Sequence, residues 1–413
     1  MPPGGKNIKS ICNFCGAESS KQTVLINGKN GSSICVNCIY DIVHFIEKEI
    51  PKAKTPELNN FIEKTESSDH LQSPKTIKSY LDQYVISQDD AKKVIAVAVY
   101  SHYKRINQKM YQNIDTELQK SNILLIGETG TGKTLLAQTI SKLLNVPYTI
   151  VDATAFTEAG YVGEDIESMI TRLLQNCNYN VELAEKGIIY IDEIDKIGRK
   201  SANPSITRDV SGEGVQQGLL KLLEGSECLV PPAGGRKHPE QKLIKVNTKN
   251  ILFICGGSFE GLDKIIGKRL NTHAIGFKGK LKQELNNKHL FSQITANDLK
   301  QFGLIPEIVG RLPIISHLNP LNKEMLIDIL IQPKNALIKQ YQFFFKTEKI
   351  ELDIKPEVFS YIAELALDLK LGARGLRSIC EKLFIDSMFE LPQSGVKKLK
   401  IDMAFAKNKF KAS

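Results

Sequence analysis

Residues 127–134 read G-E-T-G-T-G-K-T, and this spacing of glycines, lysine and threonine is suited to binding phosphate. Glycines let backbone N–H groups curl around a phosphate, and the N-terminus of a following helix adds partial positive charge. Lys133 would reach the β- and γ-phosphates, and the Thr134 hydroxyl would bind Mg²⁺. The predicted nucleotide-binding residues are Glu128, Thr129, Gly130, Thr131, Gly132, Lys133, Thr134 and Leu135.

Two carboxylates end the apolar run at 187–191 and offer a second piece of phosphate chemistry. A buried parallel strand with acids at its carboxyl end is where open α/β sheets place their ligand chemistry. In an enzyme with a phosphate-binding loop, Asp192 would hold Mg²⁺ through water and Glu193 would polarise the attacking water. The alternative is an exposed acidic strand end, which the upstream loop makes the weaker interpretation. We therefore predict hydrolysis as well as binding.

Four of the eight cysteines form two C-x-x-C pairs, Cys12 with Cys15 and Cys35 with Cys38. Their spacing is that of a tetrahedral zinc site in which all four positions are filled, so the metal would be structural. Two disulfides or free thiols are the alternative. The apolar residues that follow at helical spacing favour protein binding or self-association over DNA binding for this module. The other cysteines lie in apolar or helical settings and are expected to be inert: Cys177, Cys228, Cys255 and Cys380.

The elements that position these residues can be read from the apolar pattern. Strands are predicted at 123–126, 148–151, 187–191 and 251–255, with helices at 91–103, 135–140 and 216–224. A helix beginning with the acids at 164–165 and a long basic loop at 267–290 are also expected. Beyond residue 318 the pattern is mainly helical, with strands near 350–354 and 397–401. These alternating elements predict an α/β fold with a parallel sheet.

Length and composition fit a multidomain globular protein. The 413 residues, 42% hydrophobic and 24% charged, contain no apolar run of 18 residues and no pattern of a signal or transit peptide. A reducing cytoplasm is therefore expected, with no membrane partner. The net charge of +9 is spread along the chain, so nucleic acid is not indicated. Four regions are predicted: a zinc-binding domain at 1–50, a flexible linker at 51–74, a large ATPase domain at 75–317 and a small domain at 318–413.

The phosphate-binding loop, the acidic strand end, a late arginine and the helical C-terminal region together resemble AAA+ ATPases. With the cysteine pairs, the motifs G-Y-V-G (160–163), R-K-H (236–238), I-G-F (275–277) and G-A-R (372–374) follow the order of the ClpX family over nearly the whole chain. The resemblance implies a homohexameric ring that hydrolyses ATP to unfold tagged proteins. It also implies delivery to a separate ClpP peptidase, and chaperone activity without that peptidase.

The resemblance also implies roles for individual residues. Tyr161 and Val162 would grip substrate in the pore, although Tyr161 alone would equally fit a turn packed on the core. Residues 199–210 match a second pore loop, and Arg236, Lys237 and His238 match the pore entrance, where tags and adaptor proteins are selected. Ile275, Gly276 and Phe277 would dock into ClpP, unless that loop is anchored to its own core. Arg311 matches an arginine finger that reaches a neighbouring subunit, and Arg374 matches the sensor-2 arginine.

Two positions depart from the family pattern, namely Glu128 where proline is usual and Ser87 where glycine is usual. Neither removes a catalytic group. No peptidase signature is present, so degradation requires a partner. Two other interpretations stay open: a nucleic-acid motor or clamp loader with the same core, and a zinc-dependent scaffold that binds ATP without turnover.

Overall fold

Five parallel strands form the central sheet, in the order β4-β5-β8-β3-β9. Their bounds are β3 Ile123–Ile126, β4 Tyr148–Asp152, β5 Ile188–Asp192, β8 Leu252–Gly257 and β9 Ile314–His317. In register, Asp152 of β4 lies beside Asp192 of β5, and Ile126 of β3 lies beside Gly257 of β8. All the carboxyl ends therefore meet at one edge of the sheet.

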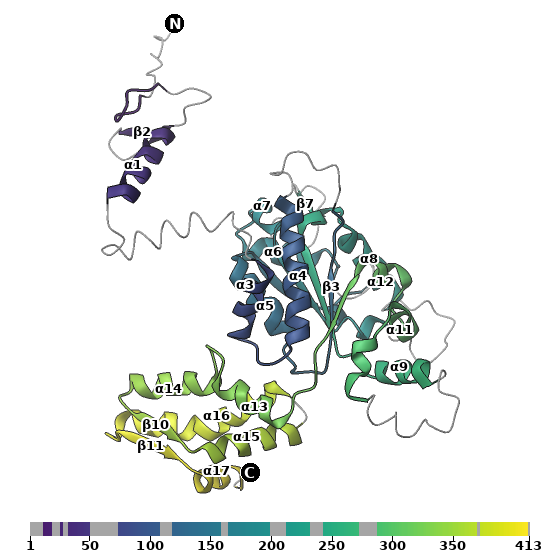
Figure 1. Cartoon of the computed structure of the whole chain (residues 1–413), viewed down its shortest axis with the longest axis vertical. Helices are drawn as coiled ribbons and strands as arrows, with labels where there is room; N and C mark the ends of the chain where they lie inside the picture. Colours follow the sequence, from purple (N-terminus) through teal and green to yellow (C-terminus); the bar gives the residue numbers. More distant parts are fainter. Residues whose placement is uncertain are drawn as a thin grey trace. The chain divides into compact units, whose positions relative to one another are not determined.

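The computed structural model describes residues 11–18, 25–27, 32–49, 73–107, 118–157, 164–198, 212–231, 243–271, 287–369 and 372–411. The chain forms two compact units, Met1–His70 and Leu71–Ser413 (Figure 1). No helix among these residues is long and apolar enough to cross a membrane.

Helices cover both faces of the sheet. Because successive strand residues face opposite sides, Ile123 and Leu125 of β3 join one apolar core, whereas Leu124 and Ile126 join the other. The first core is closed by α3 Pro74–Asp82, α4 Asp89–Ile106 and α5 Lys133–Leu144 (Figure 1). The second is closed by α6 Ser168–Asn176, α8 Glu213–Glu224, α9 Leu262–Asn271, α11 Ala296–Phe302 and α12 Pro306–Arg311.

Shorter elements connect these layers. They are η3 Ala153–Ala155, α7 Val181–Ala184, η4 Lys196–Gly198, η5 Thr248–Asn250, η6 Asn287–Gln293 and the antiparallel hairpin of β6 Glu227–Val230 with β7 Ile244–Asn247.

The C-terminal part has an apolar core of its own, in which Tyr341 and Phe384 stack with ring centroids 4.4 Å apart. Its elements are α13 Lys323–Ile331, α14 Leu337–Thr347, β10 Glu351–Ile354, α15 Pro356–Asp368, α16 Ala373–Glu390, η7 Leu391–Gln393, β11 Lys398–Ile401 and α17 Met403–Lys411. Strands β10 and β11 pair in parallel at its edge. The mainly helical pattern with two short strands is confirmed.

In the unit Met1–His70, β1 Leu25–Asn27 and β2 Ser33–Cys35 form an antiparallel pair, and α1 Val36–Glu49 follows at once. Among the residues described in this unit, the buried core consists of cysteines with Leu25 and Ile34 packed against them. So few apolar contacts are too little to hold a fold without a further crosslink.

Two expectations were wrong at their boundaries. The helix expected to begin at Glu164 begins at Ser168, because Glu164 instead bridges to Phe156 and pairs with Arg172 at 2.6 Å. The basic loop was expected from residue 267, but residues 267–271 belong to α9, which ends at Asn271. Strand β9 and the β6–β7 hairpin were not predicted. The predicted α/β fold with a parallel sheet is confirmed.

Candidate functional site

The phosphate-binding loop joins β3 to α5, as the sequence predicts. Gly130 and Gly132 take positive φ angles of 82° and 105°, which glycine adopts without strain. Lys133 Nζ donates to the carbonyls of Gly127 (2.5 Å) and Glu128 (3.0 Å). Burial lowers the pKa of Lys133, and Arg374 lowers it further, against the opposing effect of Asp192. The loop is thus ordered around a buried cation.

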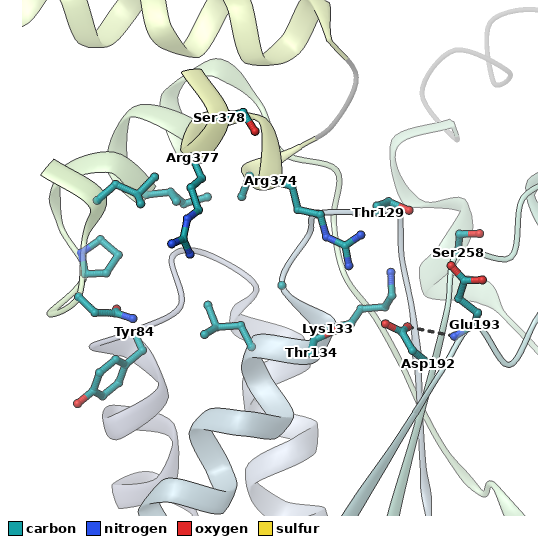
Figure 2. Close-up of a pocket in the computed structure, with 18 of the residues that line it drawn as sticks. Tyr84, Thr129, Lys133, Thr134, Asp192, Glu193, Ser258, Arg374, Arg377 and Ser378 are labelled. Atoms are coloured by element: carbon teal, nitrogen blue, oxygen red, sulfur yellow. Dashed lines mark hydrogen bonds between the residues drawn. The ribbon is translucent and has the colours of Figure 1, made fainter. Parts of the chain in front are cut away.

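A cavity of about 620 Å³ lies above this loop (Figure 2), within the usual size range of small-molecule sites. The loop residues that line it are Thr129, Gly130, Gly132, Lys133, Thr134 and Leu135. Glu128 and Thr131 are not among the lining residues. Glu128 is exposed, and the buried Thr131 donates its hydroxyl to the Glu128 carbonyl at 2.8 Å. Volume, cation and ordered glycine loop together fit a nucleoside triphosphate.

Asp192 and Glu193 reach the same cavity from the end of β5. The Asp192 carboxylate accepts the Glu193 N–H at 3.0 Å (Figure 2) and the Tyr190 hydroxyl at 3.2 Å. Glu193 has a φ of +56°, a conformation unusual for a residue with a side chain and commonest at functional sites. These carboxylate oxygens and the Thr134 hydroxyl, which lines the same cavity, form a donor set suited to Mg²⁺.

Two polar residues missed by the sequence analysis complete this edge. The fully buried Asp195 accepts the Ser258 N–H at 3.2 Å and its hydroxyl at 3.1 Å, and both residues line the cavity. Ser258 directly follows β8, the strand between β5 and β3. The sequence does contain a signal for Ser258, because the residue directly follows a buried parallel strand.

The start of α16 supplies the opposite wall. Arg374, Arg377 and Ser378 line the cavity, and Arg374 points toward Lys133 and the loop (Figure 2). The Ala373 N–H donates to the Gly130 carbonyl at 3.3 Å. The structure therefore brings Arg374 to the predicted site. Arg377 was not predicted; its Nε is paired with Glu381 at 3.0 Å.

Arg311 does not line this cavity. It ends α12 and its half-exposed guanidinium pairs with Glu224, with an Nη2–Oε1 distance of 2.8 Å. Ser87 takes a left-handed φ of 57° where a glycine would be unstrained, and it too is absent from the lining.

The four predicted zinc ligands come together in the unit Met1–His70. Their sulfur atoms all lie within 4.8 Å of one another, with Cys12–Cys38 at 4.0 Å and Cys15–Cys35 at 3.5 Å. A disulfide requires about 2.05 Å, whereas Zn–S bonds of about 2.3 Å place tetrahedral sulfurs about 3.8 Å apart. Burial raises the pKa of Cys12, but backbone N–H groups of Cys15, Cys35 and Phe14 lower it to about 6, whereas hydrogen bonding to Cys15 and burial raise the pKa of Cys38. The donor set fits Zn²⁺.

The remaining predicted positions lie outside the described residues. They are Tyr161, Val162, residues 199–210, Arg236, Lys237, His238, Ile275, Gly276 and Phe277.

A phosphate-binding loop at the carboxyl edge of a parallel sheet, an acidic strand end and an arginine from a helical C-terminal part define an AAA+ ATPase. Comparison with known proteins agrees. Residues 118–315 match the model of the AAA domain (Cdc48 subfamily), and residues 321–402 match that of the C-terminal, D2-small domain of ClpB protein.

The chain is also similar along its length to proteins named ATP-dependent Clp protease ATP-binding subunit ClpX. The Bacteroides fragilis protein is 54% identical over 98% of this chain and 96% of its own length. The Porphyromonas gingivalis protein is 50% identical over 97% and 96%, and the Treponema denticola protein is 51% identical over 92% and 90%. The chain belongs to the ClpX family. The predictions of an ATP-hydrolysing AAA+ unfoldase, with ATP, Mg²⁺ and Zn²⁺ as its cofactors, are thereby confirmed.

Proposed function

We propose that this chain assembles with itself into a hexameric ring that unfolds tagged proteins and passes them to a ClpP peptidase. The observation that carries the proposal is the single cavity shared by Lys133, Asp192, Glu193 and Arg374, in a chain about half identical to ClpX proteins throughout. Without the peptidase, the same unfolding serves as chaperone activity. The cytoplasm is the proposed location.

Each residue of the cavity has a proposed task. Lys133 offsets phosphate charge, and Asp192 with Thr134 holds Mg²⁺, which when bound neutralises charge that develops on the phosphates. Glu193 takes the proton of the attacking water. Arg374 couples nucleotide state to the C-terminal region, since α16 contacts the phosphate-binding loop directly. Arg311 acts as the arginine finger on the nucleotide of a neighbouring subunit, because it is half exposed and lies away from its own cavity.

Mechanical work follows from a division into a large domain at 75–317 and a small domain at 318–413, preceded by a zinc-binding domain at 1–50 and a linker at 51–74. ATP hydrolysis between subunits drives rigid-body motion of the large and small domains, which moves the pore residues Tyr161 and Val162. Arg236, Lys237 and His238 select tags at the pore entrance. Ile275, Gly276 and Phe277 dock into ClpP. The zinc-binding domain binds other proteins or associates with itself.

Replacing the pore tyrosine separates hydrolysis from unfolding. We expect Tyr161→Ala to retain ATP turnover within about threefold but to lose ClpP-dependent degradation of a tagged protein by about tenfold or more. Tyr179→Ala, at an exposed tyrosine outside the cavity, is the matched control and should degrade normally. Equal degradation by both variants would remove Tyr161 from the mechanism.

A nucleic-acid motor would share the same core, and it is tested in the same preparation. ATP turnover measured with and without DNA should be unchanged under our proposal. DNA stimulation combined with intact substrate protein would favour the motor instead.

A further inference from the structure

Asn122 directly precedes β3 and is buried, with 1% of its surface exposed. Its Nδ2 donates to two backbone carbonyls, that of Leu223 at 3.1 Å and that of Arg311 at 2.9 Å. Since both partners are acceptors, the amide must present its amino group to them. Its Oδ1 has no hydrogen-bond partner among the described residues, which is a cost in a buried site. The contribution of this side chain to the structure is therefore its two donated hydrogen bonds.

The two carbonyls belong to the C-terminal ends of different helices. Leu223 lies in the last turn of α8, and Arg311 is the last residue of α12. Carbonyls at helix ends lack partners within the helix, so Asn122 satisfies one from each and ties the two ends together. The tie joins them to β3, the strand that leads into the phosphate-binding loop.

Above this tie, the Glu224 carboxylate accepts from Arg311 Nε at 3.0 Å and from Nη2 at 2.8 Å. The two side chains are 43% and 54% exposed, and an exposed ion pair contributes little by itself. The direction of the guanidinium therefore depends on the position of the Arg311 backbone, which the hydrogen bond from Asn122 fixes.

We propose that Asn122 is a positioning residue for Arg311, linking the nucleotide strand of one subunit to the arginine that it offers to its neighbour. The inference rests on the proposed action of Arg311 across a subunit interface. A displacement of β3 moves Asn122. Because Asn122 is hydrogen-bonded to the Arg311 carbonyl, the backbone of Arg311 moves with it. Asn122 touches no nucleotide; its effect runs entirely through Arg311.

Lys120 provides a matched control. It lies two residues away, and its Nζ donates to the carbonyls of Leu222 (3.3 Å) and Thr248 (2.8 Å). Lys120 thus binds the same end of α8, but neither of these two hydrogen bonds goes to Arg311.

The first readout is the separation of turnover from binding. For full-length Asn122→Ala we expect kcat for ATP to fall about 10- to 100-fold, because a small misplacement of a catalytic group is that costly. Nucleotide affinity should change by less than about threefold, since the subunit's own cavity is intact. Lys120→Met should keep kcat within about threefold.

The second readout asks in which subunit Asn122 acts. Asn122→Ala chains are coexpressed with Glu193→Gln chains, and mixed rings are purified through two different tags. In these rings an Asn122→Ala subunit supplies an intact Glu193, and its Glu193→Gln neighbour supplies a well-held Arg311. ATP turnover should therefore rise at least about twofold above that of either variant alone, because only the interfaces of this composition are restored. Arg311→Ala mixed with Glu193→Gln should rise in the same way.

Each outcome decides something. A rise with Arg311→Ala but none with Asn122→Ala overturns the inference and leaves the role of Arg311 standing. No rise with Arg311→Ala overturns the action across the interface, and the inference falls with it. If Asn122→Ala does not bind nucleotide, Asn122→Ser, which keeps a donor, replaces it. Loss of nucleotide binding in both variants also overturns the inference, because Asn122 would then support the whole nucleotide domain.

Discussion

At the scale of single residues, the chemistry depends on how the Asp192 carboxylate is held. Tyr190 lies fully buried on β5, and its hydroxyl donates to Asp192 at 3.2 Å. A Cβ atom at Gly256 on the adjacent strand would lie 2.0 Å from this hydroxyl, so only glycine leaves room for it. The sequence of two strands is thus matched to one hydrogen bond on a proposed Mg²⁺ ligand.

Removing this hydroxyl should weaken Mg²⁺ binding without disturbing the core. For Tyr190→Phe we expect roughly fivefold weaker metal affinity, corresponding to one lost hydrogen bond of about 1 kcal/mol. The measurements are the Mg²⁺ dependence of ATP turnover and direct Mn²⁺ binding. Tyr148→Phe is the control, because the buried Tyr148 hydroxyl has no hydrogen-bond partner among the described residues. Equal metal affinities in the two variants would contradict this role.

At the level of secondary-structure elements, α16 makes a close contact with the phosphate-binding loop. Gly372 has a φ of +56°, and a Cβ there would lie 2.8 Å from the Thr129 carbonyl oxygen and 3.1 Å from the Gly130 Cα. The chain therefore reaches the loop through a position that tolerates no side chain. Arg374 is carried into the cavity by this approach.

Gly372→Ala should push α16 away from the loop. We expect the KM for ATP to rise about tenfold or more, because the arginine wall of the cavity is displaced. Gly395→Ala is the matched control, since Gly395 has a φ of +71° but no atom within 4 Å of its Cβ position. The KM for ATP of both variants is measured by steady-state kinetics. An unchanged KM in Gly372→Ala would contradict the prediction, and an equal rise in Gly395→Ala would attribute the effect to backbone strain alone.

A second element contact lies beneath α9, the helix that precedes the proposed ClpP-docking segment. The Asp298 carboxylate is fully buried, caps α11 through Thr295 and accepts from Arg269 Nε at 2.8 Å and Nη2 at 2.9 Å. Burial raises the pKa of Asp298, but the hydrogen bonds from Arg269 and Thr295 outweigh it and hold the pKa below its ordinary value. The ionised carboxylate therefore stabilises the fold above pH ~4 and loses this effect as the pH falls further.

Arg269→Met leaves that buried carboxylate without its cation. At pH 7 we expect a loss of about 2 kcal/mol and an apparent Tm lower by about 5 °C. The pKa of Asp298 rises in the variant, so protonation relieves the penalty there at a higher pH than in the wild type. The Tm difference should accordingly narrow between pH 7 and pH 4. Thermal unfolding of both proteins is measured across this pH range. A Tm difference that grows toward acid pH would contradict the prediction.

Sequence patterns captured the elements with strong local signals and missed those defined by tertiary pairing. The β-branched runs identified β5 and β8, and the glycine spacing identified the loop. Strand β9 is four residues long and is recognisable only through its pairing with β3. Likewise, Asp195 and Ser258 are 63 positions apart, and no local pattern connects them. Arg374 was found through resemblance, because its placement in the cavity depends on a fold contact.

At the scale of the whole molecule, the chain combines two units with different sources of stability. Extensive apolar cores support Leu71–Ser413, whereas in the described part of Met1–His70 only a few apolar side chains surround the cysteines. We therefore expect metal binding to supply the folding free energy of the smaller unit.

Loss of zinc should consequently unfold one unit and spare the other. Cys38→Ala is expected to lose the bound zinc and to expose α1 to hydrogen exchange, while ATP turnover stays within about twofold. Cys380→Ala, at a buried cysteine outside the cluster, should keep its zinc. Metal content, exchange rates and turnover are measured on the same preparations. Retention of stoichiometric zinc by Cys38→Ala would refute the four-cysteine site.

The central claim is that ATP hydrolysis by this chain unfolds proteins. The most direct measurement is the fluorescence of a stable protein bearing a degradation tag, followed with the purified chain, ATP, Mg²⁺ and ClpP to prevent refolding. We expect ATP-dependent loss of fluorescence with the wild-type chain and no loss with Glu193→Gln. Vigorous ATP hydrolysis with fluorescence unchanged across a panel of tags, especially if DNA stimulated the hydrolysis, would contradict the central claim.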